Sequence, residues 1–337
     1  MSGMKPKKTD TVRLQNMSRA FIQSASLFAA IDLELFSAIA SGANTVEGFA
    51  KNAGVSEINA ERLMTMCAAS DLIHWVEDHY ENADDVQRFL VKGEKSYAAS
   101  WLTFTRPGWK NWGNLGEKLS NQEAPTVIGG YDTMTVEYAR KYHEATSSVG
   151  FGSGRRFIKH VDLSKRHRIM DLGGGSGAYS IVAAQAHPDL SAVVFDLPPV
   201  VEITKEFIAK NHVEAQVTTQ SGDFTRDEFP AGCDVAIMAS NLPQYNREII
   251  QQVISKAFNA LEPAGEMHLI GEMLDDDRQG PIDAAIWGLM EAMSNSTGMT
   301  HTRADCVGYF EEAGFESVAV HEFIPGILVR VCGTKPE

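Results

Sequence analysis

The stretch RIMDLGGGSGAYS, residues 168–180, limits the possible fold more than any other part of this sequence. A short apolar run ends in Gly173, Gly175 and Gly177, and a helix-forming pattern follows at once. Because glycine has no Cβ, such a turn lets the backbone approach a ligand between a strand and a helix. The next apolar run ends at Asp196, where a carboxylate can accept both hydroxyls of a ribose. The sequence therefore predicts a turn of the kind that holds nucleotides.

Strand and helix patterns alternate from residue 168 to the end of the chain. Helical patterns separate the apolar runs, which occupy residues 168–172, 191–197, 215–224, 234–240, 266–274, 318–323 and 327–333. This alternation is typical of a parallel sheet with helices on both faces. We therefore predict an α/β fold of Rossmann-like type for this half of the chain.

The first hundred residues have a different, mostly helical pattern. Residues 14–40 repeat apolar side chains at helical spacing, and residues 45–91 suggest helix, turn, helix and a short hairpin. This is the outline of a winged helix, which binds DNA in some proteins. Lys and Arg number 30 against 44 Asp and Glu, and the net charge of -14 repels nucleic acids and anionic membranes. We therefore expect a dimerisation module, with no nucleic acid or membrane as partner.

The length and the cysteines narrow the class further. A chain of 337 residues, 44% hydrophobic and 22% charged, is long enough for two domains. The cysteines are widely spaced without a CxxC pair, which indicates reduced thiols rather than disulfides or a zinc cluster. The sequence also has neither an apolar signal core nor an 18-residue apolar run. We expect a cytoplasmic protein that uses no metal.

Two cofactors fit the glycine turn, a dinucleotide and S-adenosyl-L-methionine (SAM). Ala178 stands one residue later than the last Gly or Ala of a dinucleotide motif. Asp171 lies just inside the turn, where it can meet an ammonium group that no dinucleotide has. Asp223 and Phe224 end the third strand with an acceptor and an aromatic face that suit an adenine. These features favour SAM and disfavour a nicotinamide dehydrogenase.

Several motifs in this order resemble the SAM-dependent small-molecule O-methyltransferases that include hydroxyindole and caffeate enzymes. They are SASLFAAIDLELFSAIA, RIMDLGGGSGAYS, VVFDLPPVVE, SGDF, CDVAIMASNL and ADCVGYFEEAGF, and they span nearly the whole chain. The resemblance implies a winged-helix dimerisation domain over residues 1–105 and a helical linker that contributes to the substrate pocket over 106–160. It implies a SAM-binding class I methyltransferase domain over 161–337. A homodimer, a small-molecule substrate and S-adenosyl-L-homocysteine as product follow from it.

The same resemblance assigns SAM contacts by position. The methionine end of SAM would lie against the glycine turn. Its ribose would lie at the end of the second strand, and its adenine at the end of the third. The expected cofactor-binding residues are Asp171, Gly173, Gly175, Asp196, Leu197, Asp223, Phe224 and Ser240.

The chain departs from the family at the end of the fourth strand. There the family motif LHDW holds a histidine that acts as general base, and this chain has Pro243 at the matching position. The family glutamate that orients this histidine is matched by Thr300. A positioned base contributes about 10²–10⁴ in rate. Two explanations therefore remain. Another residue, with His143 and His301 as candidates, supplies the base, or the acceptor atom has no proton to lose.

A thioether sulfur is such an acceptor, since it attacks as a neutral electron pair and needs alignment rather than a base. Aromatic faces near the sulfur would favour the developing cation. We expect the catalytic pocket to contain Tyr131, Tyr142, His143, Gln244, Trp287 and His301. Glu272 ends the fifth strand and would line the pocket, but the sequence identifies no partner for a buried carboxylate there.

Our first hypothesis is S-methylation of 4-methylthio-2-hydroxybutyrate, because the baseless, aromatic pocket resembles the bacterial S-methyltransferases of dimethylsulfoniopropionate synthesis. The alternative is O- or C-methylation of an aromatic or tetrapyrrole acceptor. A SAM-binding regulator that has lost catalysis is the third hypothesis, which the missing base favours and the aromatic side chains oppose.

Overall fold

The structure is a computed structural model that describes residues 9–120, 123–129 and 134–337. It divides into two compact units, Met1–Phe104 and Thr105–Glu337, and each is considered by itself. Tyr131, one of the predicted pocket residues, lies outside the described residues.

The first unit is helical with one small hairpin. Its elements are α1 (Val12–Asp32), α2 (Leu35–Ala40), α3 (Val46–Ala53), α4 (Glu57–Ala69), β1 (Ile73–Val76), β2 (His79–Asn82), α5 (Asp84–Leu90) and α6 (Ala99–Leu102). The side chains of Phe36, Phe49 and Met64 fill its core and are almost fully buried. The helix, turn, helix and hairpin of α3, α4, β1 and β2 form the predicted winged-helix outline.

The amino-terminal half of α1 leaves a row of apolar side chains uncovered. The exposed fractions lie between 45% and 63% for Val12, Leu14, Met17, Phe21 and Ile22. Contiguous exposed apolar side chains are typical of surfaces that bind another protein. This face of α1 therefore suits a dimerisation module.

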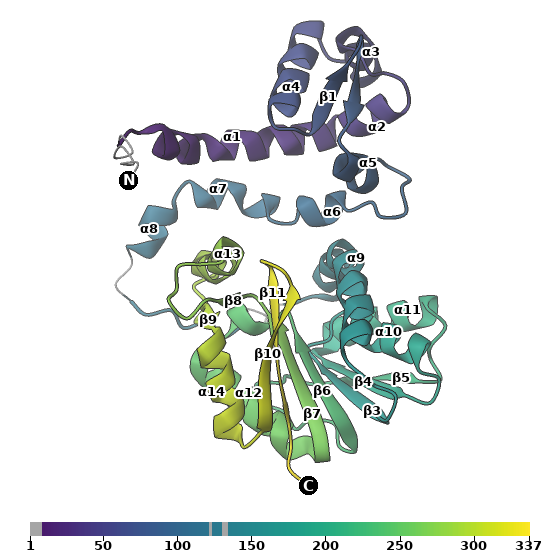
Figure 1. Ribbon diagram of the computed structural model, residues 1–337, viewed down its shortest axis with the longest axis vertical. Coiled ribbons are helices and arrows are strands. Elements are labelled where there is room, and N and C mark those ends of the chain that lie inside the picture. Colours follow the sequence, from purple (N-terminus) through teal and green to yellow (C-terminus); the bar gives the residue numbers. More distant parts are fainter. Residues whose placement is uncertain (1–8, 121–122, 130–133) are drawn as a thin grey trace, which may run out of the picture. The chain divides into compact units, whose positions relative to one another are not determined.

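The second unit is built on a seven-stranded sheet of order β10-β11-β7-β6-β3-β4-β5 (Figure 1). The strands are β3 (Arg168–Leu172), β4 (Ser191–Asp196), β5 (Val217–Ser221), β6 (Cys233–Ala239), β7 (Leu261–Gly271), β10 (Glu316–Ile324) and β11 (Leu328–Thr334). Strands β3 to β7 are parallel, whereas β11 runs antiparallel to both of its neighbours. The sequence analysis predicted a parallel sheet, and β11 differs because residues 325–327 are too few for a crossover.

Helices cover both faces of this sheet, as its nearly continuous apolar strands require. Helices α9 (Val136–His160), α10 (Ala178–Ala186) and α11 (Pro198–Lys210) lie on one face, and α12 (Arg247–Ala260) and α14 (Arg303–Ala313) lie on the other (Figure 1). The smaller elements are α7 (Trp109–Trp112), α8 (Leu115–Leu119), α13 (Ile282–Met290), β8 (Met273–Leu274), β9 (His301–Thr302) and the 3₁₀ turns η1 (Arg106–Gly108), η2 (Leu242–Gln244) and η3 (Glu291–Met293). The resulting fold is the predicted class I methyltransferase architecture.

A capping box starts helix α14 directly after His301. The Thr302 hydroxyl accepts from the Asp305 N–H at 3.0 Å, and the Asp305 carboxylate accepts from the Thr302 N–H at 2.9 Å. Since a lost N-cap costs about 1 kcal/mol, Thr302→Ala should lower the free energy of unfolding in urea by that amount. Ser56→Ala is the matched control, because Ser56 makes no capping bond at the start of α4. Equal stability of the two variants would contradict this account.

Three further features bear on the class of protein. None of the described helices is long and apolar enough to cross a bilayer. All four cysteines are free. Within the described residues, His, Cys, Asp and Glu side chains form no group of three that could hold a metal ion.

Candidate active site

The carboxyl ends of five parallel strands meet at one edge of the sheet, where open α/β sheets bind their ligands. After each of these strands comes a residue proposed for the site from the sequence, or, after β5, the residue just before one. These residues are Gly173 after β3, Leu197 after β4, Gly222 after β5, Ser240 after β6 and Glu272 after β7.

The glycine turn has a backbone that only glycine adopts easily. Gly173, Gly175 and Gly177 have φ angles of 64°, 57° and 71°. The turn is also crowded. A Cβ on Gly173 would lie 2.9 Å from the Phe224 ring, and one on Gly175 would lie 2.6 Å from Cε1 of His143. The turn is therefore a bare backbone surface flanked by two predicted site residues.

Asp196 is joined directly to this turn. One of its carboxylate oxygens accepts from the Gly175 N–H at 2.8 Å, and the other accepts from the Leu197 N–H at 2.7 Å. Burial raises the pKa of Asp196 to about 6, so the group is mostly ionised at neutral pH. The structure therefore brings Gly175, Asp196 and Leu197 together, as predicted.

Asp171 lies beneath the turn. Its side chain is covered by Gly174, accepts from the Ser180 hydroxyl at 2.8 Å and is only 1% exposed. Burial raises the pKa of this carboxyl to about 6. We predicted from the sequence that Asp171 meets an ammonium group directly, and the structure instead places its side chain beneath the turn, where it supports the backbone.

The end of β5 carries the predicted adenine residues. The Phe224 ring is buried and meets Tyr245 edge-on, with ring centroids 5.0 Å apart. One oxygen of Asp223 accepts from the N–H and the hydroxyl of Thr225, at 2.8 Å and 2.6 Å. The other oxygen lies 3.6 Å from Arg226 Nε and keeps acceptor capacity for a ligand.

The end of β6 contains a strained residue and a side chain that the sequence analysis did not assign. Ser240 has a φ of 61°, which is unfavourable for a residue other than glycine and often marks a functional site. The next residue, Asn241, donates its amide to the carbonyls of Ala239 at 3.0 Å and Gly173 at 3.3 Å. Asn241 therefore ties the end of β6 to the glycine turn. An amide directly after a buried strand was the available signal.

The position of the family base is occupied by a buried Pro243 in η2. The adjacent Gln244 has a side-chain oxygen, Oε1, that is enclosed but has no hydrogen-bond partner in the described part of the chain. A buried acceptor without a partner costs about 1–3 kcal/mol. A donor on a bound ligand would remove this cost, which fits the prediction that Gln244 lines the pocket.

His301 was predicted to act as a base or to bind a substrate, and the structure contradicts this. The side chain is fully buried. Its Nδ1 lies 2.8 Å from the Tyr309 hydroxyl, and its Nε2 lies 2.9 Å from the Tyr245 carbonyl oxygen. Burial lowers the pKa of His301, so the ring is neutral and both nitrogens are in use. His301 is a core residue that links β9, α14 and the end of η2.

Tyr142 and His143 lie together on α9, with ring centroids 5.0 Å apart. Burial, together with the charges of nearby Tyr138, Glu272 and Asp196, raises the pKa of Tyr142 to about 12. Burial lowers the pKa of His143 to about 4, and neither ring nitrogen bonds to another described residue. His143 therefore packs against the turn as a neutral ring and is a weak base.

Trp287, predicted to line the catalytic pocket, lies half-buried on α13. A hydrogen bond from Trp287 stabilises the ionised form of Asp283, although burial raises the pKa of that carboxyl overall. The interaction orients the indole within α13.

Glu272 is the group whose importance the sequence did not reveal. It follows β7, its side chain is only 8% exposed, and the described residues offer it no ion pair. Burial raises its pKa to about 7, and the charge of Asp283 contributes in the same direction. A Cβ on the preceding Gly271 would lie 3.0 Å from Leu242, the neighbour of Pro243. The structure therefore places a buried carboxyl, with its pKa raised to about 7, directly after the residue that packs against Leu242.

Comparison with known families decides the class. Residues 128–316 match the model of an O-methyltransferase domain, and residues 15–92 match that of an O-methyltransferase dimerisation domain. The chain belongs to the O-methyltransferase family. The dimerisation domain of this O-methyltransferase indicates a homodimer, and the first unit supplies it.

Two curated relatives match this O-methyltransferase along nearly its whole length. The 3-hydroxy-5-methyl-1-naphthoate 3-O-methyltransferase of Streptomyces sahachiroi is 30% identical, over 99% of this chain and 98% of the relative. The tetracenomycin polyketide synthesis 8-O-methyl transferase of Streptomyces glaucescens is 27% identical, over 95% of each. Human N-acetylserotonin methyltransferase, solved with SAM, shares the fold with a TM-score of 0.82 and 22% identity, over 99% of this chain and 100% of that one.

Proposed function

We propose that this enzyme transfers the methyl group of SAM to a hydroxyl oxygen of a small aromatic molecule, with Glu272 as the base. The observation that carries this proposal is the buried Glu272 carboxyl, whose pKa of about 7 suits proton removal at neutral pH. The names of the relatives support it, since both describe O-methylation of aromatic or polyketide compounds. Neither name describes methylation of sulfur.

The residues at the sheet edge fit SAM. The bare turn at Gly173 and Gly175 suits the methionine end, because a side chain on either glycine would fill that space. Asp196 and the adjacent Leu197 suit the ribose, while Asp223 and Phe224 suit the adenine. Ser240 and the segment 106–160, including Tyr142 and His143, would complete the pocket. We propose that residues 106–160 form a helical linker between a dimerisation domain at 1–105 and a SAM-binding domain at 161–337.

Bound SAM supplies an electrophilic methyl group on a sulfonium sulfur. In the proposed reaction the acceptor hydroxyl oxygen forms a bond to that methyl carbon while the carbon–sulfur bond breaks. The hydroxyl proton passes to the Glu272 carboxylate, which is returned to its ionised form by solvent. Gln244 Oε1 accepts a hydrogen bond from the ligand and fixes its orientation.

A second candidate is S-methylation of a thioether such as 4-methylthio-2-hydroxybutyrate, in dimethylsulfoniopropionate synthesis. One observation favours it: Pro243 occupies the position of the family base, and His143 is too weak a base to replace it. A thioether loses no proton when it is methylated, so this reaction would need no general base. It would leave the properties of Glu272 without a role.

A methyl-transfer assay with labelled SAM separates the two candidates. The acceptors should include hydroxynaphthoates, simple phenols and 4-methylthio-2-hydroxybutyrate, and mass spectrometry should identify each product. We expect a methyl ether from a hydroxyaromatic acceptor, with kcat/KM at least about 100-fold above that for the thioether. A sulfonium as the main product would replace our proposal with the second candidate.

A further inference from the structure

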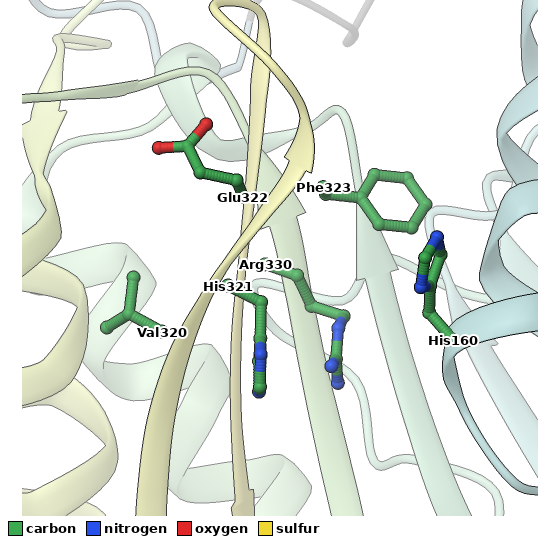
Figure 2. A pocket seen from close by; sticks show the side chains of 6 residues that line it. All are labelled: His160, Val320, His321, Glu322, Phe323 and Arg330. Atoms are coloured by element: carbon green, nitrogen blue, oxygen red, sulfur yellow. The ribbon is translucent and has the colours of Figure 1, made fainter.

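A second pocket lies on the sheet face near the end of α9, beside strands β10 and β11 (Figure 2). It has a volume of about 370 Å³, within the range of ligand pockets. Its lining residues are His160, Val320, His321, Glu322, Phe323 and Arg330. Three of these six side chains are basic, in a protein of net charge -14. The pocket is therefore a local exception to the charge of the chain.

Arg330 is the deepest charge in this pocket. It lies on β11, only 6% exposed, and no carboxylate of the described residues pairs with it. Its guanidinium donates to Nδ1 of His268 at 3.0 Å. Burial lowers the pKa of His268, so this imidazole is a neutral partner. The other side chain that bonds to Arg330 is the Cys332 thiol, which burial also keeps neutral. A buried guanidinium that meets only neutral groups has lost its hydration without gaining a counter-ion.

The neighbouring carboxylate is already used by another cation. Glu266 lies 3.2 Å from Nε2 of His268 and pairs with Arg166 at 2.9 Å. The row of Arg166, Glu266, His268 and Arg330 thus contains two cations, one anion and one neutral ring. It holds one positive charge in excess.

Two imidazoles bring further donors to the same place. His321 is the cross-strand neighbour of Arg330, and Figure 2 shows their side chains pointing the same way, with His160 approaching from α9. Burial lowers the pKa of His321, and the charges of Arg330 and His160 lower it further. The three groups therefore act on one another as a cluster of like charge.

The carboxylate at the rim does not neutralise this cluster. Glu322 points to the other side of its strand in Figure 2 and pairs with Arg303 of α14 at 2.7 Å. Arg156 of α9, also close by, donates to the backbone carbonyl of Phe323 and adds another positive charge. The elements around the pocket thus contribute more cations than anions.

We propose that this pocket binds a small oxyanion, sulfate or a phosphate group, through Arg330, His321 and His160. Guanidinium and imidazolium groups form charge-assisted hydrogen bonds to such oxygens, and an anion here would supply the counter-charge that Arg330 lacks. The site is separate from the proposed methyl transfer and does not depend on it.

Calorimetric titration with sulfate, at constant ionic strength set by chloride, tests this proposal. Sulfate keeps its charge of −2 near neutral pH, so any pH dependence comes from the protein. We expect binding about tenfold tighter at pH 6 than at pH 8, because the His321 imidazole gains charge as the pH falls. Absence of sulfate binding at pH 6 would overturn the proposal.

Variants locate the binding. His321→Ala and Arg330→Met should each weaken sulfate binding by about tenfold or more, since each removes a charged donor. His321 is exposed on the edge strand β10, so its variant should fold even if Arg330→Met does not. His187→Ala, on the loop between α10 and β4, is the matched control and should bind as the wild type does. Unchanged affinity in His321→Ala would contradict the assignment.

The source of the oxyanion is addressed by comparing inorganic phosphate with phenyl phosphate under the same conditions. Tighter binding of phenyl phosphate would indicate an organic monoester as ligand, because the Phe323 ring provides an apolar surface on the side of β10 that carries His321. Equal affinity would indicate the free ion. Failure of both to bind would again overturn the proposal.

Discussion

Replacing Gly175 by alanine should lower the affinity for SAM by more than about tenfold, because a Cβ in the left-handed region costs about 1–2 kcal/mol and here also meets a side chain. Gly175 has a φ of 57°, and its Cβ would lie 2.6 Å from Cε1 of His143. The turn must therefore shift, and the Gly175 N–H, which donates a hydrogen bond of 2.8 Å to Asp196, must shift with it. Isothermal titration with SAM measures the effect.

Two further variants separate the crowding from the backbone strain. Gly232→Ala imposes the same strain, at a φ of 69°, but its Cβ would meet nothing within 4 Å. It should lower stability slightly and leave the SAM affinity unchanged. Adding His143→Ala to Gly175→Ala should recover part of the affinity, since it removes the contact. SAM binding by Gly175→Ala at wild-type affinity would show that the turn does not hold the cofactor.

The second large effect is expected for Glu272→Gln. Loss of a positioned base lowers the rate of proton-coupled transfer by about 10²–10⁴, so single-turnover methyl transfer to a hydroxyaromatic acceptor should fall by that factor. SAM affinity should not change, because the proposed cofactor contacts do not include Glu272. Glu262→Gln provides the control, since Glu262 is an exposed residue at the other end of β7.

Stability shows whether Glu272→Gln acts through the chemistry or through unfolding. Burial raises the pKa of Glu272 from 4.5 to about 7, so the folded state binds its proton more tightly than the unfolded state does. The charged group therefore disfavours folding, fully above pH 7 and progressively less as the pH falls toward 4.5. Glutamine removes the charge, and the Tm of the variant at pH 8 should not fall. A lower Tm together with lost activity would count against a catalytic role.

The sequence predicted the features that depend on local backbone geometry. Gly173, Gly175 and Gly177 all have the positive φ that a tight strand-to-helix turn requires. Asp196 lies against this turn because it ends the adjacent parallel strand, β4 beside β3. Both features follow from residues near one another in sequence or from the regular order of an α/β sheet, so a pattern is enough to find them.

Features that depend on burial and on distant partners were not predictable. His301 looked like an available imidazole, but Tyr309 and the Tyr245 carbonyl, 56 residues away, occupy both of its nitrogens. Glu272 looked like an unexplained carboxylate until the structure showed how little of it is exposed. Periodicity reveals which positions face the core, but it does not reveal the hydrogen-bond partner or the solvation that sets a pKa.

The most direct test of the proposed reaction is the pH dependence of single-turnover methyl transfer from saturating SAM to an aromatic hydroxyl that itself ionises well above the range studied. If Glu272 takes the proton, the rate should rise about tenfold per pH unit below pH 7 and become constant above it. The Glu272→Gln variant should lack this rise. A wild-type rate that stays constant from about pH 5.5 to about pH 8.5 would contradict the account, because a base with the pKa of Glu272 would then not be accepting the proton.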